Sequence, residues 1–265
     1  MALTDYVKIY NSGRQLIIND SYKNLRLKQI VKNISYNTST VTNSTASDGV
    51  LYYVNDEGNK FPILKYPFNH TNIVALSLYP CGIGIHTILV NGKIYIYFIP
   101  DDSSLKRDQV CEKIKNNLTV YFLTDEQPEL PEWGIGLFIW NVKGEIVFNS
   151  NARYVKVLGL INRDGVNTNI SRSGSSAWYD EFDYSEDTLA IIPFSMHEQW
   201  VYNPQIFKEW WQTIYFGLNQ AQRPSKVIIN AHTYQHTYVH KDLDALPDSP
   251  YFSTNILIIS TASFK

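Results

Sequence analysis

Three histidines lie four positions apart near the C-terminus, at His232, His236 and His240. On a helix this spacing would place three imidazole rings on one face, where they could bind a metal ion. The residues between them, among them Tyr234 and Tyr238, favour a strand, and four positions along a strand span about 13 Å. One strand cannot bring all three rings to one ion, so we predict exposed histidines on a solvated strand face. A metal site shared between symmetric subunits is the alternative.

An acidic run from Asp180 to Asp187 is the other group of side chains that could hold a cation. Calcium loops have a glycine at their bend and this run has none, so we predict a solvated loop. The sequence leaves open a pair of carboxylates for glycoside cleavage, because such a pair needs only spatial proximity. The motifs of serine hydrolases, zinc proteases and nucleotide-binding loops are absent from the sequence. We predict no enzyme and no cofactor, and assign no catalytic, cofactor-binding or metal-ligating residue.

Aromatic side chains make up 14% of the chain, with 19 Tyr and 6 Trp. The pairs Trp178-Tyr179 and Trp200-Tyr202 stand beside segments that we expect to be loops. Such rings can stack on the faces of sugars, and Tyr and Trp are also enriched at protein–protein interfaces. Oligomeric contact is the commoner use, so the sequence favours a protein interface over a glycan site.

The overall composition excludes several classes of function. With 23 basic and 25 acidic residues, the net charge is −2, which gives no basic surface for nucleic acid. The chain begins without a basic, apolar leader, and no apolar run reaches the length of a membrane helix. Cys81 and Cys111 lie far apart without metal-ligand spacing. We expect a soluble, unexported protein in a reducing compartment, with no nucleic-acid partner and no membrane span.

A repeated block supplies the framework for these side chains. Residues 9–31 align with 139–161 at a constant offset of 130, which pairs Ile9 with Ile139. Nearly all the remaining aligned positions keep the same residue class. Each copy is typical of a β-hairpin followed by a strand of alternating apolar and basic residues. Weaker similarities at other offsets link residues 75–78 with 190–194 and 87–90 with 213–216. We interpret the sequence as an internal duplication.

Further strands are predicted outside the repeat. Asn91-Gly92 between the apolar runs 83–90 and 93–99 is the strongest short signal for a hairpin, and the second run should lie inside its sheet. Strands are also predicted at 226–238 and 254–261, and the ambiguous segment 207–216 is assigned to a strand. One short helix is predicted from Ser104 to Ile114. The polar stretches 37–47 and 167–176 are predicted to be exposed loops suited to contacts.

The predicted fold is therefore all-β, with at most one or two short helices. The acidic, proline-rich segment between Asp125 and Glu132 cannot continue a strand or helix. It predicts two tandem β-sandwich-like domains, a first copy at 1–126 and a second copy at 134–265, joined by a linker at 127–133.

The hairpin pattern, present at 7–21 and again at 136–150, resembles the N-terminus of a family of small tailed-bacteriophage proteins encoded among tail genes. The family usually shows one copy, whereas this chain has two. The resemblance implies a virion component near the tail tip, baseplate or fibre attachment region, made in the host cytoplasm. It implies other tail proteins as partners, and it names no catalytic residue.

The expected function is thus a non-enzymatic structural or adaptor protein of a phage tail, able to form a homo-oligomer. Two similar units in one chain could occupy pseudo-equivalent positions in a ring. The alternative is a module that binds a host receptor or surface glycan, and a polysaccharide hydrolase is third.

Overall fold

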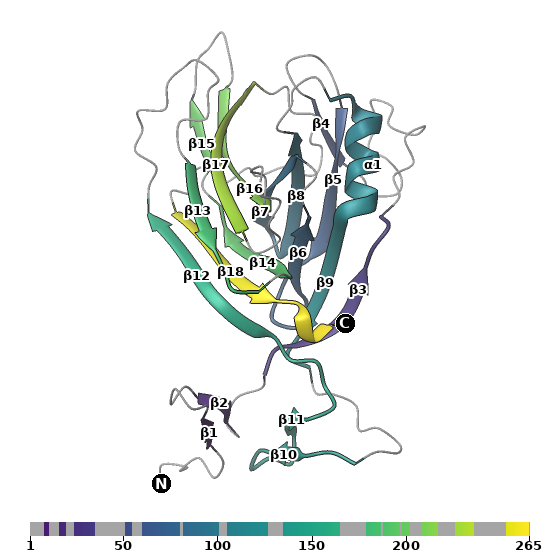
Figure 1. Ribbon diagram of the computed structural model, residues 1–265, viewed down its shortest axis with the longest axis vertical. Helices are drawn as coiled ribbons and strands as arrows, with labels where there is room; N and C mark the ends of the chain where they lie inside the picture. Colours follow the sequence, from purple (N-terminus) through teal and green to yellow (C-terminus); the bar gives the residue numbers. More distant parts are fainter. Residues whose placement is uncertain are drawn as a thin grey trace.

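The structure is a computed structural model, and it describes residues 8–10, 16–19, 24–34, 51–54, 60–79, 82–100, 105–126, 135–164, 179–186, 188–196, 198–201, 208–216, 226–235 and 253–264. The predicted all-β fold is confirmed, because most of these residues lie in strands joined by antiparallel pairing. One α-helix, α1 (Arg107–Asn117), and a terminal 3₁₀ helix, η2 (Ala262–Phe264), complete the described elements (Figure 1).

Two large sheets contain most of the strands. The six-stranded sheet has the order β12 (Lys156–Asp164), β18 (Ser253–Ser260), β14 (Leu189–Ser195), β6 (Ile73–Leu78), β9 (Leu118–Thr124), β3 (Arg26–Val31). The eight-stranded sheet has the order β13 (Tyr179–Asp183), β17 (Lys226–Gln235), β16 (Lys208–Phe216), β7 (Ile83–Val90), β8 (Lys93–Pro100), β5 (Lys60–Pro67), β4 (Leu51–Val54), with β15 (Glu198–Val201) paired to β16. Two small hairpins, β1 (Lys8–Tyr10) with β2 (Leu16–Asn19) and β10 (Phe138–Trp140) with β11 (Ile146–Asn149), lie apart from both sheets.

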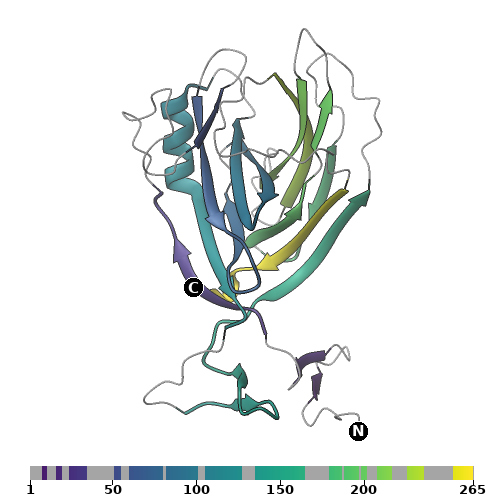
Figure 2. The same cartoon turned by 180° about the vertical axis from the view of Figure 1, so that it is seen from behind.

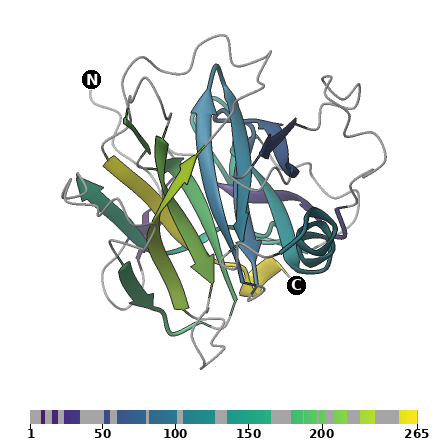
Figure 3. The ribbon, with the colours of Figure 1, turned by 90° about the horizontal axis from the view of Figure 1, so that it is seen from above.

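The sequence on each side of the predicted linker contributes strands to both sheets. Within the two large sheets, strands before residue 126 occupy one side and strands after residue 135 the other, as Figures 1 and 2 show from opposite directions. The sides meet where β6 contacts β14 and β7 contacts β16, each through one bridge pair, Leu76 with Ile191 and Ile85 with Ile214. Viewed from above, the two sides form one continuous structure (Figure 3). The predicted units 1–126 and 134–265 are therefore packed as the two halves of one sandwich, and residues 127–134 lie outside the described ranges.

Reading outward from this central contact, the two halves have equivalent strand orders. In the six-stranded sheet the order is β6, β9, β3 on one side and β14, β18, β12 on the other. In the eight-stranded sheet β7 and β8 are matched by β16 and β17. Both halves use their strands in the same chain order, so the fold has a local two-fold relation between them.

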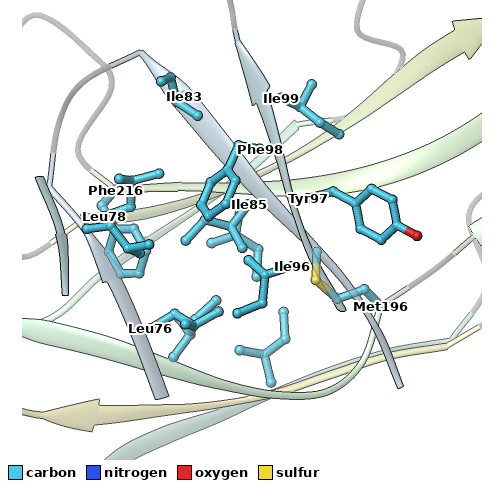
Figure 4. Close-up of a cluster of buried hydrophobic side chains, with 14 of the residues drawn as sticks. Leu76, Leu78, Ile83, Ile85, Ile96, Tyr97, Phe98, Ile99, Met196 and Phe216 are labelled. Carbon is cyan, nitrogen blue, oxygen red and sulfur yellow. The ribbon is translucent and has the colours of Figure 1, made fainter. Parts of the chain in front are cut away.

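The apolar core lies between the two sheets. Leu76 and Val120 of the six-stranded sheet and Ile85, Ile96 and Phe98 of the other are fully buried in one cluster that draws on both halves. Successive side chains of a strand point to opposite faces, so Phe98 and Tyr97 leave β8 in different directions, and both are fully buried members of the cluster (Figure 4). Burial of this kind stabilises the fold by about 1.5–3 kcal/mol for each large side chain.

Several predicted elements are confirmed. The hairpin turn has Asn91 and Gly92 at φ 48° and 70°, as a tight hairpin turn requires. β8 is buried along nearly its whole length and lies between β7 and β5, inside the sheet as predicted. The ambiguous segment is the strand β16, and the strands predicted near 226 and 254 are β17 and β18.

Two predictions need correction. The helix begins at Arg107 and not at Ser104, because Lys106 takes the N-cap position, where its N–H donates to Gln109 Oε1 at 2.9 Å. The acidic run is not a loop throughout, since Tyr179–Asp183 forms β13 and pairs along its length with β17. Cross-strand pairing outweighed the weak strand propensity of its acidic residues. The predicted loops at 37–47 and 167–176 lie outside the described residues.

Candidate interaction surface

The second small hairpin carries a cluster of exposed apolar side chains. Its loop is closed by Asn141, whose Oδ1 accepts the N–H groups of Lys143 at 2.9 Å and Glu145 at 3.0 Å. Gly144 follows with φ +77°, a left-handed conformation that glycine adopts without strain. The turn chemistry of the sequence therefore fixes the register of β10 on β11.

One face of this hairpin packs inward and the rest is exposed. Ile139, Ile146 and Val147 are buried, and Ile139 and Val147 form a small cluster with Phe148. Four large apolar side chains are exposed: Ile135 fully, Leu137 by 54%, Trp140 by 50% and Val142 by 62%. Because apolar side chains at this density are unusual on a free surface, they mark a surface suited to binding another apolar surface.

An aromatic anchor holds the hairpin beneath the sandwich. The Phe148 ring stacks on Tyr154 with centroids 5.0 Å apart and an angle of 14° between the planes. The Tyr154 hydroxyl accepts the Asn149 N–H at 2.7 Å, and partial burial raises the pKa of this phenol. Asn24 Nδ2 donates to the Val147 carbonyl at 3.4 Å, which ties the hairpin to the other half of the chain.

The two halves of the chain cross just above this anchor. Leu27 N–H donates to the Arg153 carbonyl at 2.8 Å, and Val155 N–H donates to the Leu25 carbonyl at 3.0 Å. Arg153 Nη1 also donates to the Phe264 carbonyl at 2.9 Å, so η2 is fastened to the same crossing. The small hairpins extend below this point in Figure 1. The crossing therefore positions the exposed hairpin on a rigid base.

The first hairpin has the same backbone pairing. Lys8 lies opposite Asn19 as Phe138 lies opposite Asn149, and each hairpin has one register shift, after Ile9 and after Ile139. The following strands agree as well, since β3 has its irregularity between Leu27 and Gln29 and β12 has its own between Val157 and Gly159. All of these positions are related by the offset of 130 found in the sequence.

A second exposed apolar patch lies on the outer face of the six-stranded sheet. Val157 is 54% exposed, Leu160 60% and Phe194 43%. Leu160 lies opposite Leu257 across the β12–β18 pair, and the Phe194 ring meets Phe68 edge to face at 6.5 Å. These three exposed side chains belong to two different strands, β12 and β14, whereas those of the β10–β11 hairpin lie within eight residues of one another. The hairpin is therefore the stronger candidate for a binding surface.

Ion pairs lie at the margins of both halves. Lys28 Nζ lies 3.0 Å from Glu126 Oε2, and Lys156 contacts Glu186, which also accepts the Ser260 hydroxyl. The hydrogen bond from Lys28 and its charge lower the pKa of Glu126, and the hydrogen bonds from Lys156 and then Ser260 lower the pKa of Glu186. The alternating basic residues predicted on the repeated strand thus belong to ordinary surface pairs, which contribute little individually.

The residues that could bind a cation are not brought together in the described structure. His232 lies on β17, where it faces Trp211 of β16 in the register, while His236 and His240 fall outside the described ranges. Glu181 lies 2.5 Å from Lys226 Nζ and Asp183 lies 4.0 Å from it, so both carboxylates are paired with that lysine. No group of three potential metal ligands occurs among the described residues.

The sequence drew attention to other aromatic residues than those that form this surface. Tyr179 begins β13 and Trp200 lies on β15, whereas Trp178 and Tyr202 lie outside the described part of the chain. Trp140 was missed, although its position within the repeated block was known. A comparison of the two copies for changes from polar to apolar would have found Ile135, Phe138 and Val142, but Trp140 corresponds to Tyr10 and gives no such signal.

Comparisons with known proteins give no relative. No family model, curated protein or solved structure matches the chain. The resemblance to tail proteins therefore stays a prediction from the hairpin motif. Within the described residues, no helix has the length and hydropathy needed to cross a membrane.

Proposed function

We propose that this chain is a non-enzymatic structural component of a tailed-phage virion, an adaptor at the tail tip, baseplate or fibre attachment site. The observation that carries the proposal is the β10–β11 hairpin. It presents Leu137, Trp140 and Val142 to solvent while its inner face is anchored by Tyr154. An assembly protein needs a rigid apolar surface of this kind for its neighbours.

The arrangement of the halves supports the same proposal. Two units with equivalent strand order, joined at Leu76–Ile191 and Ile85–Ile214, give one chain two similar frameworks about a local two-fold relation. We infer that these units arose by internal duplication. Such a chain can contact two neighbours in similar ways, and it can thereby adapt one symmetry to another or bridge two copies of a partner.

Particle composition tests the proposal. Phage particles would be purified through a density gradient from a lysate of the phage that encodes this chain, and the chain would be sought by mass spectrometry and by immunogold labelling in the electron microscope. We expect a fixed copy number per particle and gold at the tail. A chain that stays in the soluble fraction, with unlabelled tails, would contradict a virion role.

A glycan- or receptor-binding role is the second candidate, and Trp140 favours it. The indole is half exposed beside Phe138, with ring centroids 5.9 Å apart, so one aromatic face is available to a sugar ring. Binding of host surface polysaccharide by the purified chain, lost in Trp140→Ala and kept in Val142→Ala, would replace the adaptor proposal with this one.

A further inference from the structure

The two edges of the β10–β11 hairpin differ in how their backbone groups are satisfied. On β11, the Asn149 N–H donates to the Tyr154 hydroxyl and the Val147 carbonyl accepts from Asn24. Both groups point away from β10, so side chains of the protein itself cover this edge. The β11 edge is closed to an added strand.

On the opposite edge, that of β10, the described residues provide no such cover. The Ser150 N–H donates to the Leu137 carbonyl, and the Asn141 N–H donates to the Glu145 carbonyl, each at 2.9 Å, so residues 137 and 141 direct their backbone groups toward β11. Because these directions alternate along a strand, Phe138 and Trp140 direct theirs outward. Among the described residues, β10 pairs with β11 alone.

The side chains of this edge fit a second copy of the same strand. Residues 135–142, Ile-Gly-Leu-Phe-Ile-Trp-Asn-Val, contain no charge, so antiparallel self-pairing places no like charges opposite each other. Phe138 and Trp140 form one aromatic pair on one face. Exposed edges in natural proteins are commonly protected by lysine or proline, and β10 has neither.

The first hairpin provides an internal contrast. Its backbone register is the same, but Lys8 occupies the position of Phe138, and Asp5 corresponds in sequence to Ile135. Lysine on an edge strand opposes pairing with another copy, because its charge would lie beside an equal charge and lose water. The difference selects the β10 edge over the β1 edge.

We propose that the β10 edge is a self-association site at which two copies of the chain pair antiparallel across a two-fold axis. Centred on Phe138, this pairing exchanges two hydrogen bonds between the Phe138 backbones and joins two hairpins into a four-stranded sheet. The exposed parts of Leu137 and Trp140 on each copy become buried. The inference concerns the purified chain and does not rest on a virion role.

Sedimentation equilibrium of the purified full chain over a concentration series tests the site. We expect a monomer–dimer equilibrium for the natural sequence. Phe138→Lys gives β10 the residue that the first hairpin has, and it should weaken the dimer by more than about tenfold in dissociation constant. Phe138→Pro should do the same by removing the outward N–H, at a position where that group makes no bond to β11.

Leu160→Lys is the matched control, because it also replaces an apolar strand residue by a charge but lies on β12, outside the β10–β11 hairpin. It should leave the dimer unchanged. Circular dichroism and the thermal midpoint of each variant show that the sandwich is folded. A natural chain that is monomeric at every concentration overturns the proposal. A dimer that Phe138→Lys and Phe138→Pro leave intact, or that Leu160→Lys disrupts equally, overturns it as well.

Discussion

The two small hairpins have one backbone plan and two different surfaces. In both, the third residue of the first strand lies opposite the first residue of the second strand, Tyr10 with Leu16 and Trp140 with Ile146. Several edge and turn positions of the second hairpin differ in kind from their equivalents in the first, whereas the exposed Leu137 and Trp140 correspond to Val7 and Tyr10. Asp5, Lys8 and Ser12 stand where Ile135, Phe138 and Val142 stand 130 positions later.

This difference shows which positions the fold constrains and which it leaves free. The central pair stays apolar in both copies, with Ile9 and Ile18 matched by Ile139 and Phe148, because it sets the register of the hairpin. Edge and turn positions carry no such constraint, so they can acquire a binding surface. We interpret the first hairpin as the version protected from association and the second as the version adapted to it.

The central contact offers the strongest test of the relation between the halves. Leu76 and Ile191 are fully buried and lie opposite each other where the halves meet. Leu76→Ala and Ile191→Ala should each lower the free energy of unfolding by about 2–5 kcal/mol, as core truncations do. Urea denaturation followed by tryptophan fluorescence and by circular dichroism measures both variants.

Because the halves share one core, we expect a single transition for both probes in each variant. Val142→Ala, at an exposed turn position, serves as the control and should change stability little. Two separate transitions, with only one of them moved by Ile191→Ala, would mean that the halves fold independently, as tandem domains would.

Gly144 provides the next largest expected effect, in the loop of the second hairpin. Its φ of +77° is strained for any side chain, and an added Cβ would contact nothing within 4 Å. Gly144→Ala should therefore cost about 1–2 kcal/mol from backbone conformation alone. Gly144→Asn should cost less, since Asn tolerates this region. Hydrogen exchange of the Asn141 and Ser150 amides measures the local opening, and equal exchange in both variants would refute the conformational explanation.

The sequence predicted individual strands and turns better than it predicted which strands of the two halves pair with each other. Asn91-Gly92 predicts its hairpin because both residues tolerate positive φ, and the alternation of apolar residues predicts β3 and β12. Which strands lie beside β6 and β7 depends on contacts between residues more than a hundred positions apart, such as Leu76 with Ile191. Apolar strands of similar composition do not specify such partners, so both sheets could not be assembled from the sequence.

The weaker sequence similarities between the halves show how much of the strand pairing the repeat could indicate. Segment 75–78 was matched to 190–194, and β6 and β14 do lie side by side. The sequence similarity between 87–90 and 213–216 aligns Ile88 with Ile214, whereas the structure places Ile85 opposite Ile214. Strands that contain several Ile and Val residues resemble one another at more than one register, so an alignment of their sequences can be displaced by a few residues. The exposed surface was less predictable still, because the burial of Ile139 and the exposure of Trp140 depend on how the crossing places the hairpin.

Tyr154 and Asn24 occupy equivalent positions in the two copies and hold the same hairpin in different ways. Tyr154→Phe removes the acceptor of the Asn149 N–H but keeps the ring stacked on Phe148. The loss should be about 0.5–1.5 kcal/mol, the net value of one hydrogen bond. Faster exchange of the Asn149 amide, measured by NMR, reports it. Exchange unchanged from the natural protein would show that this bond does not secure the β11 edge.

The surface ion pairs should give the smallest difference in stability between the halves. The folded state lowers the pKa of Glu126 through Lys28 and that of Glu186 through Lys156 and Ser260. A carboxyl whose pKa is lower in the folded than in the unfolded state stabilises the protein above the unfolded value, near 4.3, and loses that effect as the pH falls through the folded value. Both pairs should therefore contribute at neutral pH and vanish in acid.

Lys28→Met and Lys156→Met test the two pairs separately. Each variant should differ from the natural chain in urea midpoint at neutral pH, and the difference should shrink below a pH of about 4 and in high salt. Lys156→Met should retain part of the acid dependence, because Glu186 keeps its hydrogen bond from Ser260 and is only 19% exposed, against 47% for Glu126. Lys156→Met with no residual acid dependence would show that Ser260 does not hold the Glu186 carboxylate.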